Sequence, residues 1–314
     1  MAKKKDLKGF SSFLNNSVDF TLVITVLLLL SLGLVMVLSA SSPTSFQESG
    51  KSYNYFVRQL IFAIIGLVAM YFVSKIDYRI YQRFYKQAWW LSVILLLAVL
   101  LVGDEAKGAK RWIDIGFTRF QPSEIVKFLM IVFYAGILVK NRNELGKFWK
   151  GLVKHMLYLV PIIVLLILEP HLSTSIVIII TCCVIVLTAG CKFWQFCATG
   201  VVAVGGIGSL ATILYFASEF FREKFQYALT RIVTFMDPWQ DASGTGWQVI
   251  QSLYAIGSGG LFGAGLGDSK QKYLYLPEPH NDFIFSVLAE ELGFVGCIIV
   301  FILFYLFCGI GSNN

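Results

Sequence analysis

Long apolar segments recur along this chain of 314 residues, and they constrain its fold more than any other feature. A helix needs about 20 apolar residues to cross the hydrocarbon core of a bilayer. Because hydrophobic residues make up 57% of the chain and charged residues only 14%, the sequence predicts an all-α polytopic membrane protein. We expect eight transmembrane helices, at residues 18–40, 56–74, 88–103, 124–139, 155–168, 172–190, 193–217 and 283–309.

Basic residues predict the orientation of these helices, since Lys and Arg in short loops favour the cytoplasmic side. They gather before the first span, after the second span and after the fourth span. The N-terminus is therefore expected in the cytoplasm, and the first span is read as an uncleaved helix because its apolar core exceeds that of a signal peptide. This topology treats 1–314 as a single integral membrane domain with two long outer loops, 104–123 and a large one at 218–282 before the eighth helix.

Both predicted outer loops carry basic residues, against the topological preference. The charges are Lys107, Lys110, Arg111 and Arg119 in the first loop and Arg222, Lys224, Arg231, Lys270 and Lys272 in the second. Two interpretations stay open: long translocated loops escape the rule, or the charges bind an anionic ligand such as a phosphate. Nucleic acid is not expected as that ligand, because the net charge of +7 comes largely from the cytoplasmic loops.

An acidic residue, Asp282, stands at the entrance of the last apolar run. A carboxylate at the centre of a spanning helix costs roughly 2.5 to 3.5 kcal/mol, so such residues usually face a bundle or an aqueous cavity and serve function. Asp282 is therefore the first candidate for chemistry. Asp282, Ser286, Glu290 and Gly293 recur at helical spacing, which predicts a polar stripe with Glu290 as a structural partner.

Other polar patterns are less specific. Glu124 and Lys127 are three residues apart, which predicts an ion pair of either stabilising or catalytic role. Cysteine and histidine residues lack metal-ligand spacing, so neither a zinc site nor a disulfide framework is expected. The glycine-rich run 257–267 lacks phosphate-loop spacing and instead predicts tight turns and close packing.

Distinctive sequence blocks lie at 108–114, 120–127, 231–239, 246–252, 255–260 and 276–285. Together they resemble the SEDS proteins (shape, elongation, division and sporulation), the FtsW, RodA and SpoVE family. The sequence of residues 266–272 and that of Pro277 to Asp282 are more similar to FtsW or SpoVE than to RodA. Two departures are Glu169-Pro-His-Leu-Ser-Thr174, where the family commonly has Gln-Pro-Asp-Leu-Gly-Thr, and the absence of the last two of ten spans, which predicts a C-terminally truncated chain.

The resemblance implies a peptidoglycan glycosyltransferase that polymerises lipid II at the outer face of the bacterial plasma membrane, in cell division, elongation or sporulation. The implied partners are lipid II, membrane lipid, a class B penicillin-binding protein and other divisome or elongasome membrane proteins. Asp282 matches the catalytic aspartate, acting as general base or holding a divalent cation, Mg²⁺ or Mn²⁺, as the only possible cofactor. Two alternatives stay open: a transporter (flippase) of lipid II and a non-catalytic scaffold. The implied substrate-binding residues are Lys110, Arg111, Trp112, Gln121, Ser123, Glu124, Lys127, Arg231, Gln248, Glu278 and His280.

Overall fold

Six helices in the described part of the chain are long and apolar enough to cross a membrane. The computed structural model describes residues 19–106, 109–114, 119–169, 172–198, 200, 219–273 and 275–313. A shorter apolar helix, Ser173–Thr188, coincides with the sixth predicted span, whereas most of the seventh, 193–217, lies outside the described residues. The structure therefore agrees with a polytopic helical protein without confirming the number eight. The chain divides into two units, residues 1–75 with 218–314 and residues 76–217, and each is described by itself.

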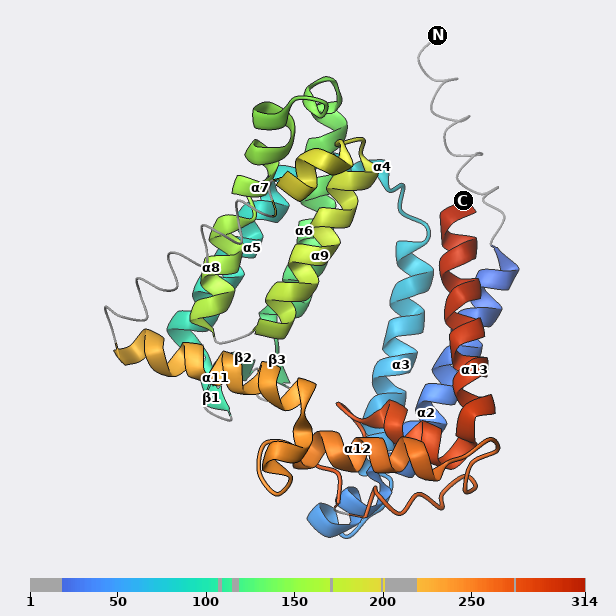
Figure 1. Ribbon diagram of the computed structural model, residues 1–314. Helices are drawn as coiled ribbons and strands as arrows, with labels where there is room; N and C mark the ends of the chain where they lie inside the picture. Colours follow the sequence, from blue (N-terminus) through green and yellow to red (C-terminus); the bar gives the residue numbers. More distant parts are fainter. Residues whose placement is uncertain are drawn as a thin grey trace. The chain divides into compact units, whose positions relative to one another are not determined.

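The first unit is built around α2 (Phe20–Ser49), which packs against both α3 (Asn54–Val73) and α13 (Ile284–Asn313) (Figure 1). The carboxylate of Asp19 starts α2 by accepting hydrogen bonds from the amides of Thr21 and Leu22 at 3.0 and 3.1 Å. Gly50 ends it in the left-handed region, at φ 70°. The segment before α13 holds α11 (Glu219–Met236), the 3-10 turn η3 (Pro238–Asp241) and α12 (Trp247–Ser258), and α12 crosses near one end of α2 and α13.

Glycines allow two backbones of this unit to touch. The run 257–267 lies directly on α13, where the amides of Ala264 and Gly265 donate to the carbonyls of Glu290 and Glu291 at 2.9 and 3.1 Å. A β-carbon on Gly263, which has φ +82°, would overlap the backbone of Glu291. This arrangement confirms the tight turns and close packing expected of the glycine-rich run. At the same place α13 is kinked at Gly293, whose φ of 66° and ψ of −166° are not helical.

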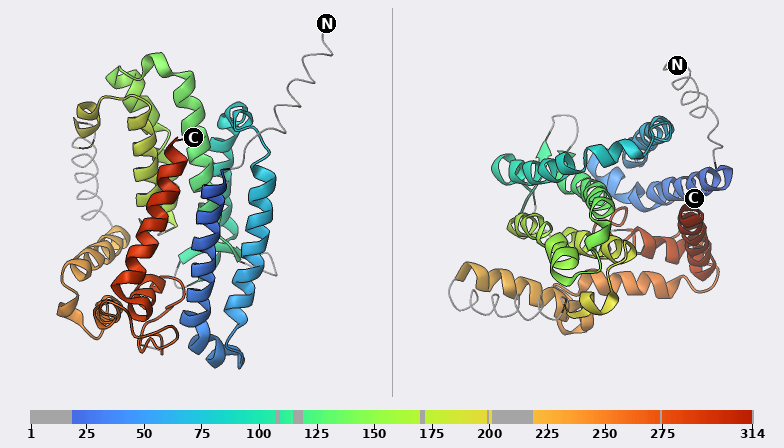
Figure 2. Two further views of the ribbon diagram at one scale, coloured as in Figure 1. Left: turned by 90° about the vertical axis from the view of Figure 1, so that its right-hand side faces the viewer. Right: turned by 90° about the horizontal axis from the view of Figure 1, so that it is seen from above.

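The second unit is a bundle of apolar helices in which α5 (Tyr85–Val102) packs along α6 (Pro122–Lys140) (Figure 1, Figure 2). Next to this pair lie α8 (Val160–Leu168) and α9 (Leu172–Thr188). Their facing side chains form one buried apolar cluster, which includes Leu96, Met130, Tyr134, Ile162 and Ile178. Shorter elements complete the unit: α4 (Arg79–Arg83), η1 (Arg142–Glu144), the π-helical η2 (Phe148–Val153) and α7 (Lys154–Leu157).

A small antiparallel sheet occupies the segment between α5 and α6, which the sequence suggested was a loop. Strand β2 (Ala109–Asp114) is central and pairs with β1 (Asp104–Ala106) and with β3 (Arg119–Phe120). The sequence analysis did not predict these strands, because strands of three, six and two residues are too short to show an apolar alternation. The sheet gives a fixed backbone to the segment that carries Lys110, Arg111 and Trp112.

Candidate functional site

Asp282 lies in the turn that leads into α13, two residues before the helix begins at Ile284. Its side chain is exposed, whereas Leu276, at the other end of the same segment, is buried and anchors the segment in the core of the first unit. The turn is closed by the amide of Asn281, which donates to the carbonyl of Glu278 at 3.1 Å. Glu278 itself adopts φ 49°, a left-handed conformation that is uncommon outside glycine. A defined turn thus presents the Asp282 carboxylate at the start of a membrane-spanning helix.

His280 fixes this turn to the helical core. The imidazole is only 7% exposed, and its ring lies against the ring of Tyr55 with centroids 4.4 Å apart. Its Nε2 is 3.7 Å from a carboxylate oxygen of Glu278, while its buried Nδ1 has no hydrogen-bond partner in the described structure. Burial lowers the pKa of His280, and the carboxylates of Glu278, Glu48 and Asp282 offset this only in part. His280 is therefore a neutral group beside Asp282 at neutral pH.

Sequence reasoning missed the contribution of the connection between α2 and α3. Tyr55 at the start of α3 donates its hydroxyl to Glu48 near the end of α2 at 2.8 Å, and the same Tyr55 ring supports His280. These residues are more than 200 positions from Asp282 in the sequence, so no local pattern links them. The site around Asp282 therefore joins the segment 276–283 with the α2–α3 connection of the same unit.

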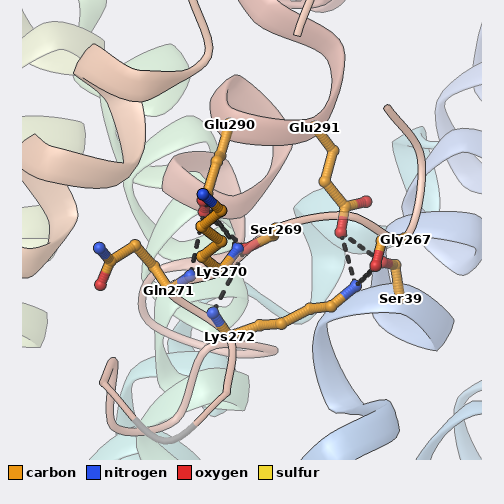
Figure 3. Close-up of polar contacts among 8 residues, drawn as sticks. All are labelled: Ser39, Gly267, Ser269, Lys270, Gln271, Lys272, Glu290 and Glu291. Carbon is orange, nitrogen blue, oxygen red and sulfur yellow. Dashed lines mark hydrogen bonds and ion pairs between the residues drawn. The ribbon is translucent and has the colours of Figure 1, made fainter. Parts of the chain in front are cut away.

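Glu290 holds the loop that precedes this turn (Figure 3). Its carboxylate accepts hydrogen bonds from the Ser269 hydroxyl at 2.5 Å and from the Lys270 amide at 2.8 Å. Glu290 and Ser286 are both buried, as expected for the inward side of the predicted polar stripe. Asp282 and Gly293 differ from that stripe, because the first lies before the helix and the second interrupts it. Glu290 thus has the structural role that the sequence suggested.

Lys272 contradicts the idea that the basic residues of its loop are free to bind an anion. Its side chain is 3% exposed and its ammonium lies 2.9 Å from the carboxylate of Glu291, which is fully buried (Figure 3). The same ammonium donates to the Gly267 carbonyl at 2.6 Å and to the Ser39 hydroxyl at 3.0 Å. Ser39 in turn donates to Glu291 at 2.6 Å. The signal in the sequence was Glu291 itself, a charge within an apolar span that needs a partner.

Arg111, one of the residues predicted to bind an anion, lies in β2 of the second unit. It is partly buried, and its Nε donates to the backbone carbonyl of Glu169 at the end of α8, at 3.4 Å. Trp112 is also partly buried in β2, and Lys110 pairs with Glu105 across the sheet through its backbone. Contact with the α8–α9 connection therefore fixes Arg111, although Pro170 and His171 of that connection lie outside the described residues.

Glu169 was not among the predicted site residues, yet it is the most perturbed carboxyl group near Arg111. Its side chain is 1% exposed, and Oε1 has no hydrogen-bond partner within the described residues. Burial raises the pKa of Glu169 from 4.5 to about 7, with the positive charge of Arg111 opposing the shift. A buried carboxyl that titrates near neutral pH beside an arginine is typical of functional sites, although structural networks produce it as well.

Four further predicted residues lie at the start of α6, which follows β3 directly. Glu124 and Lys127 form the expected ion pair at 2.8 Å, with side chains 54% and 33% exposed. At this exposure the pair contributes little to stability, about 0 to 1 kcal/mol. Gln121 is the residue before the first turn of α6 and Ser123 is buried within that turn. These side chains share one helix end and belong to the same unit as Arg111.

The remaining predicted residues belong to the first unit. Gln248 is exposed on the first turn of α12, beside Trp247, whose indole donates to the Tyr275 carbonyl at 3.0 Å. This bond ties α12 to the segment that carries Asp282. Arg231 lies in α11, where the structure describes only its backbone. The structure thus brings Glu278, His280 and Asp282 together in one turn and links Gln248 to it through Trp247.

No group of three or more His, Cys, Asp or Glu side chains in the described residues has the arrangement of a metal site. Asp282 with Glu278 and His280 is therefore not such a group, and Mg²⁺ usually takes only one or two carboxylates together with several waters. A depression of about 540 Å³ between α11 and η3 is lined by Thr230, Asp237 and Asp241 among others, and by none of the predicted site residues.

Comparison with known proteins agrees with this picture. A family model described as "Cell cycle protein", for FtsW, RodA and SpoVE, matches residues 20–312. The chain is 39% identical to the probable peptidoglycan glycosyltransferase FtsW of Coxiella burnetii, covering 93% of this chain and 76% of the relative. It is 38% identical to stage V sporulation protein E of Bacillus subtilis, covering 92% and 76%.

Solved structures with the same fold include a chain of a peptidoglycan synthase complex that coordinates polymerization and crosslinking. The two chains have a TM-score of 0.68 and 26% sequence identity, and the match covers 93% of this chain and 76% of that chain. The rod shape determining protein RodA of Thermus thermophilus has a TM-score of 0.60 and 25% identity over 93% and 73%. Apolar helices and these relatives agree on a multi-pass membrane protein. On the match over residues 20–312 and the identity to FtsW and SpoVE, this chain belongs to the FtsW, RodA and SpoVE family of cell cycle proteins.

Proposed function

We propose that this chain is a peptidoglycan glycosyltransferase that polymerises lipid II at the outer face of the bacterial plasma membrane. The observation that carries the proposal is the turn that holds Asp282 exposed in front of α13, next to the buried His280. An exposed carboxylate at the mouth of a membrane bundle suits chemistry on a substrate whose lipid tail stays in the bilayer. The relatives named as peptidoglycan glycosyltransferases support the same reaction class.

Asp282 acts as the general base in this proposal. Its carboxylate takes the proton of the acceptor sugar hydroxyl while the oxygen attacks the anomeric carbon of the donor. The bond between that carbon and the diphosphate oxygen breaks, and the lipid diphosphate leaves with its electron pair. The rigid turn at Glu278 to Asp282 holds the base in place, so little reorganisation is needed when the substrate arrives.

Arg111 is the proposed partner of the departing diphosphate. A guanidinium suits this role because it stays charged and donates in a fork that matches phosphate oxygens. Its Nε bond to the Glu169 carbonyl orients the side chain. Lys110, Trp112, Gln121 and Ser123 are proposed to bind the same donor. Holding a divalent cation is the alternative role proposed for Asp282.

The membrane orientation belongs to the proposal as well. The positive-inside preference of the basic residues around α4, η1 and η2 supports a cytoplasmic position for those elements and an outer position for the segments with Arg111 and Asp282. A class B penicillin-binding protein is the proposed partner, supported by the likeness to a chain of a synthase complex. Transport of lipid II finds less support, because Glu290 is fixed by its loop and Glu124 is paired with Lys127.

Polymerisation of purified lipid II tests the function class. Wild-type chain, alone and with a class B penicillin-binding protein of its organism, should convert lipid II to glycan strands, and the Asp282→Ala variant should not. Movement of labelled lipid II across vesicles is measured with the same two proteins. Transport without polymer would contradict the enzyme and favour the transporter, whereas neither activity in the folded wild type would favour a scaffold.

A further inference from the structure

A pocket of about 310 Å³ lies in the second unit at the end opposite the sheet, between the start of α5, the end of α6 and the segment around α7. Three lysines line it, Lys86, Lys140 and Lys154, together with the amide of Asn141. Its lining contains no acidic residue. The volume is at the lower end of the range for small-molecule sites, about 300 to 1,000 Å³, which fits a small polar group better than a large ligand.

The rest of the lining is aromatic and held in place. Trp89 donates its indole N–H to the Tyr158 carbonyl at 2.9 Å, and its ring meets the Tyr158 ring edge to face at 6.1 Å between centroids. Phe133 packs on Tyr158 at 5.3 Å. Trp90, exposed on the outer side of α5, continues the aromatic surface. Trp and Tyr rings with this mixture of apolar and polar edges are typical of the level of lipid headgroups.

The lysine charges are largely uncompensated. Lys154 is 3.9 Å from Glu144, and both side chains are about half exposed. Lys86 and Lys140 are exposed and form no ion pair with any residue that the structure describes. Three ammonium groups around one small pocket repel one another, so an anion that enters it gains from all three. A phosphate oxyanion has the charge and the acceptor oxygens that such ammonium groups bind.

We propose that this pocket binds the headgroup of an anionic phospholipid of the inner leaflet. The predicted orientation places this end of α5 and α6 in the cytoplasm, where anionic lipids give the membrane surface a negative potential. The phosphate lies among Lys86, Lys140 and Lys154, and the acyl chains run along the exposed apolar sides of Trp90 and Ile94 on α5. The pocket lies at the opposite end of the unit from Arg111, so lipid binding there does not depend on the proposed reaction.

Lipid titration of the full chain tests this site. Delipidated protein in an uncharged detergent is titrated with phosphatidylglycerol, phosphatidylcholine or inorganic phosphate, and bound lipid is measured by native mass spectrometry. Phosphatidylglycerol should bind the wild type more tightly than phosphatidylcholine, and added salt should weaken it. Equal binding of the two lipids would overturn the proposal. Displacement of phosphatidylglycerol by millimolar inorganic phosphate would also overturn it, because a free anion would then be the ligand.

Two charge variants locate the site. K86Q/K140Q should weaken phosphatidylglycerol binding by roughly tenfold or more, because it removes two of the three lysine charges that attract the anionic headgroup. K147Q/K150Q removes two exposed lysines from the same end of the unit without touching the pocket lining, and should leave binding nearly unchanged. K86R/K140R keeps the charge and should retain the lipid. An equal loss in both glutamine variants would mean that general surface charge, and not this pocket, attracts the lipid.

Discussion

At the scale of single residues, the buried charges of the first unit explain how the loop that precedes the Asp282 turn is held. The ammonium of Lys272 and the carboxylate of Glu291 are 2.9 Å apart, and both side chains are shielded from solvent. Desolvation of two charges costs as much as their attraction returns, so such a pair adds little net stability when complete. Removing one partner is different, because the other charge then stays buried and uncompensated. The pair therefore acts as a specific link between α2, the loop 267–272 and α13.

Lys272→Met and Glu291→Gln should each destabilise the folded chain by about 3 to 5 kcal/mol. Lys272→Met/Glu291→Gln should lose much less than the sum of the two single losses, because no charge is left buried. Lys270→Met is the control, since the exposed Lys270 contributes only its backbone amide to the Glu290 carboxylate. Denaturant unfolding in detergent measures all four. Additive losses in the double variant would contradict a direct interaction.

Glu169 predicts a pH dependence of stability. Its pKa is about 7 in the folded chain against 4.5 for an unperturbed glutamate, so the folded state holds the proton more tightly. Stability is therefore lost as pH rises from about 4.5 to about 7, by up to about 3 kcal/mol. Glu169→Gln keeps the neutral shape and should be more stable than wild type at pH 8 but not at pH 4.5. If the stability difference between Glu169→Gln and wild type is the same at pH 4.5 and pH 8, the raised pKa of Glu169 is contradicted.

At the scale of elements, contact between the glycine run and α13 sets where the helix bends. The amides of Phe294 and Val295 donate to the carbonyls of Gly260 and Leu261 at 2.9 and 3.1 Å, immediately after the kink at Gly293. The loop therefore supplies backbone bonds where the helix interrupts its own ladder. Such a contact requires residues without a β-carbon on both sides. It also explains why the first part of α13 keeps its position relative to the loop that carries Lys272.

Gly263→Ala should destabilise the chain by about 1 to 3 kcal/mol, because Gly263 has φ +82° and its new β-carbon would meet the Glu291 backbone. Gly257→Ala is the matched control, since a β-carbon there has nothing within 4 Å and Gly257 lies inside α12. The control should be neutral or stabilising by up to about 1 kcal/mol. Thermal unfolding in detergent compares the two. Similar melting temperatures for both variants would contradict the close contact.

At the scale of the whole molecule, the sequence predicts the helical architecture well and the local supports of the site poorly. Apolar length alone predicts the helices, because a bilayer core needs about 20 such residues. Asp282 and Glu290 are visible as charges in or beside an apolar run. The β1–β2–β3 sheet and the contact of Tyr55 with His280 are not, since the strands are too short for a periodic signal and the ring contact joins residues 225 positions apart in sequence.

The kinetic effect of one neutralised carboxylate tests the central claim most directly. Asp282→Asn and Asp268→Asn each remove a charge from an exposed aspartate of the same unit, and kcat for lipid II polymerisation is measured for both. If Asp282 is the general base, its variant should lose about 100-fold to 10,000-fold in kcat with KM little changed, and the Asp268 variant should match wild type. A folded Asp282→Asn protein that polymerises lipid II at the wild-type rate would contradict the account.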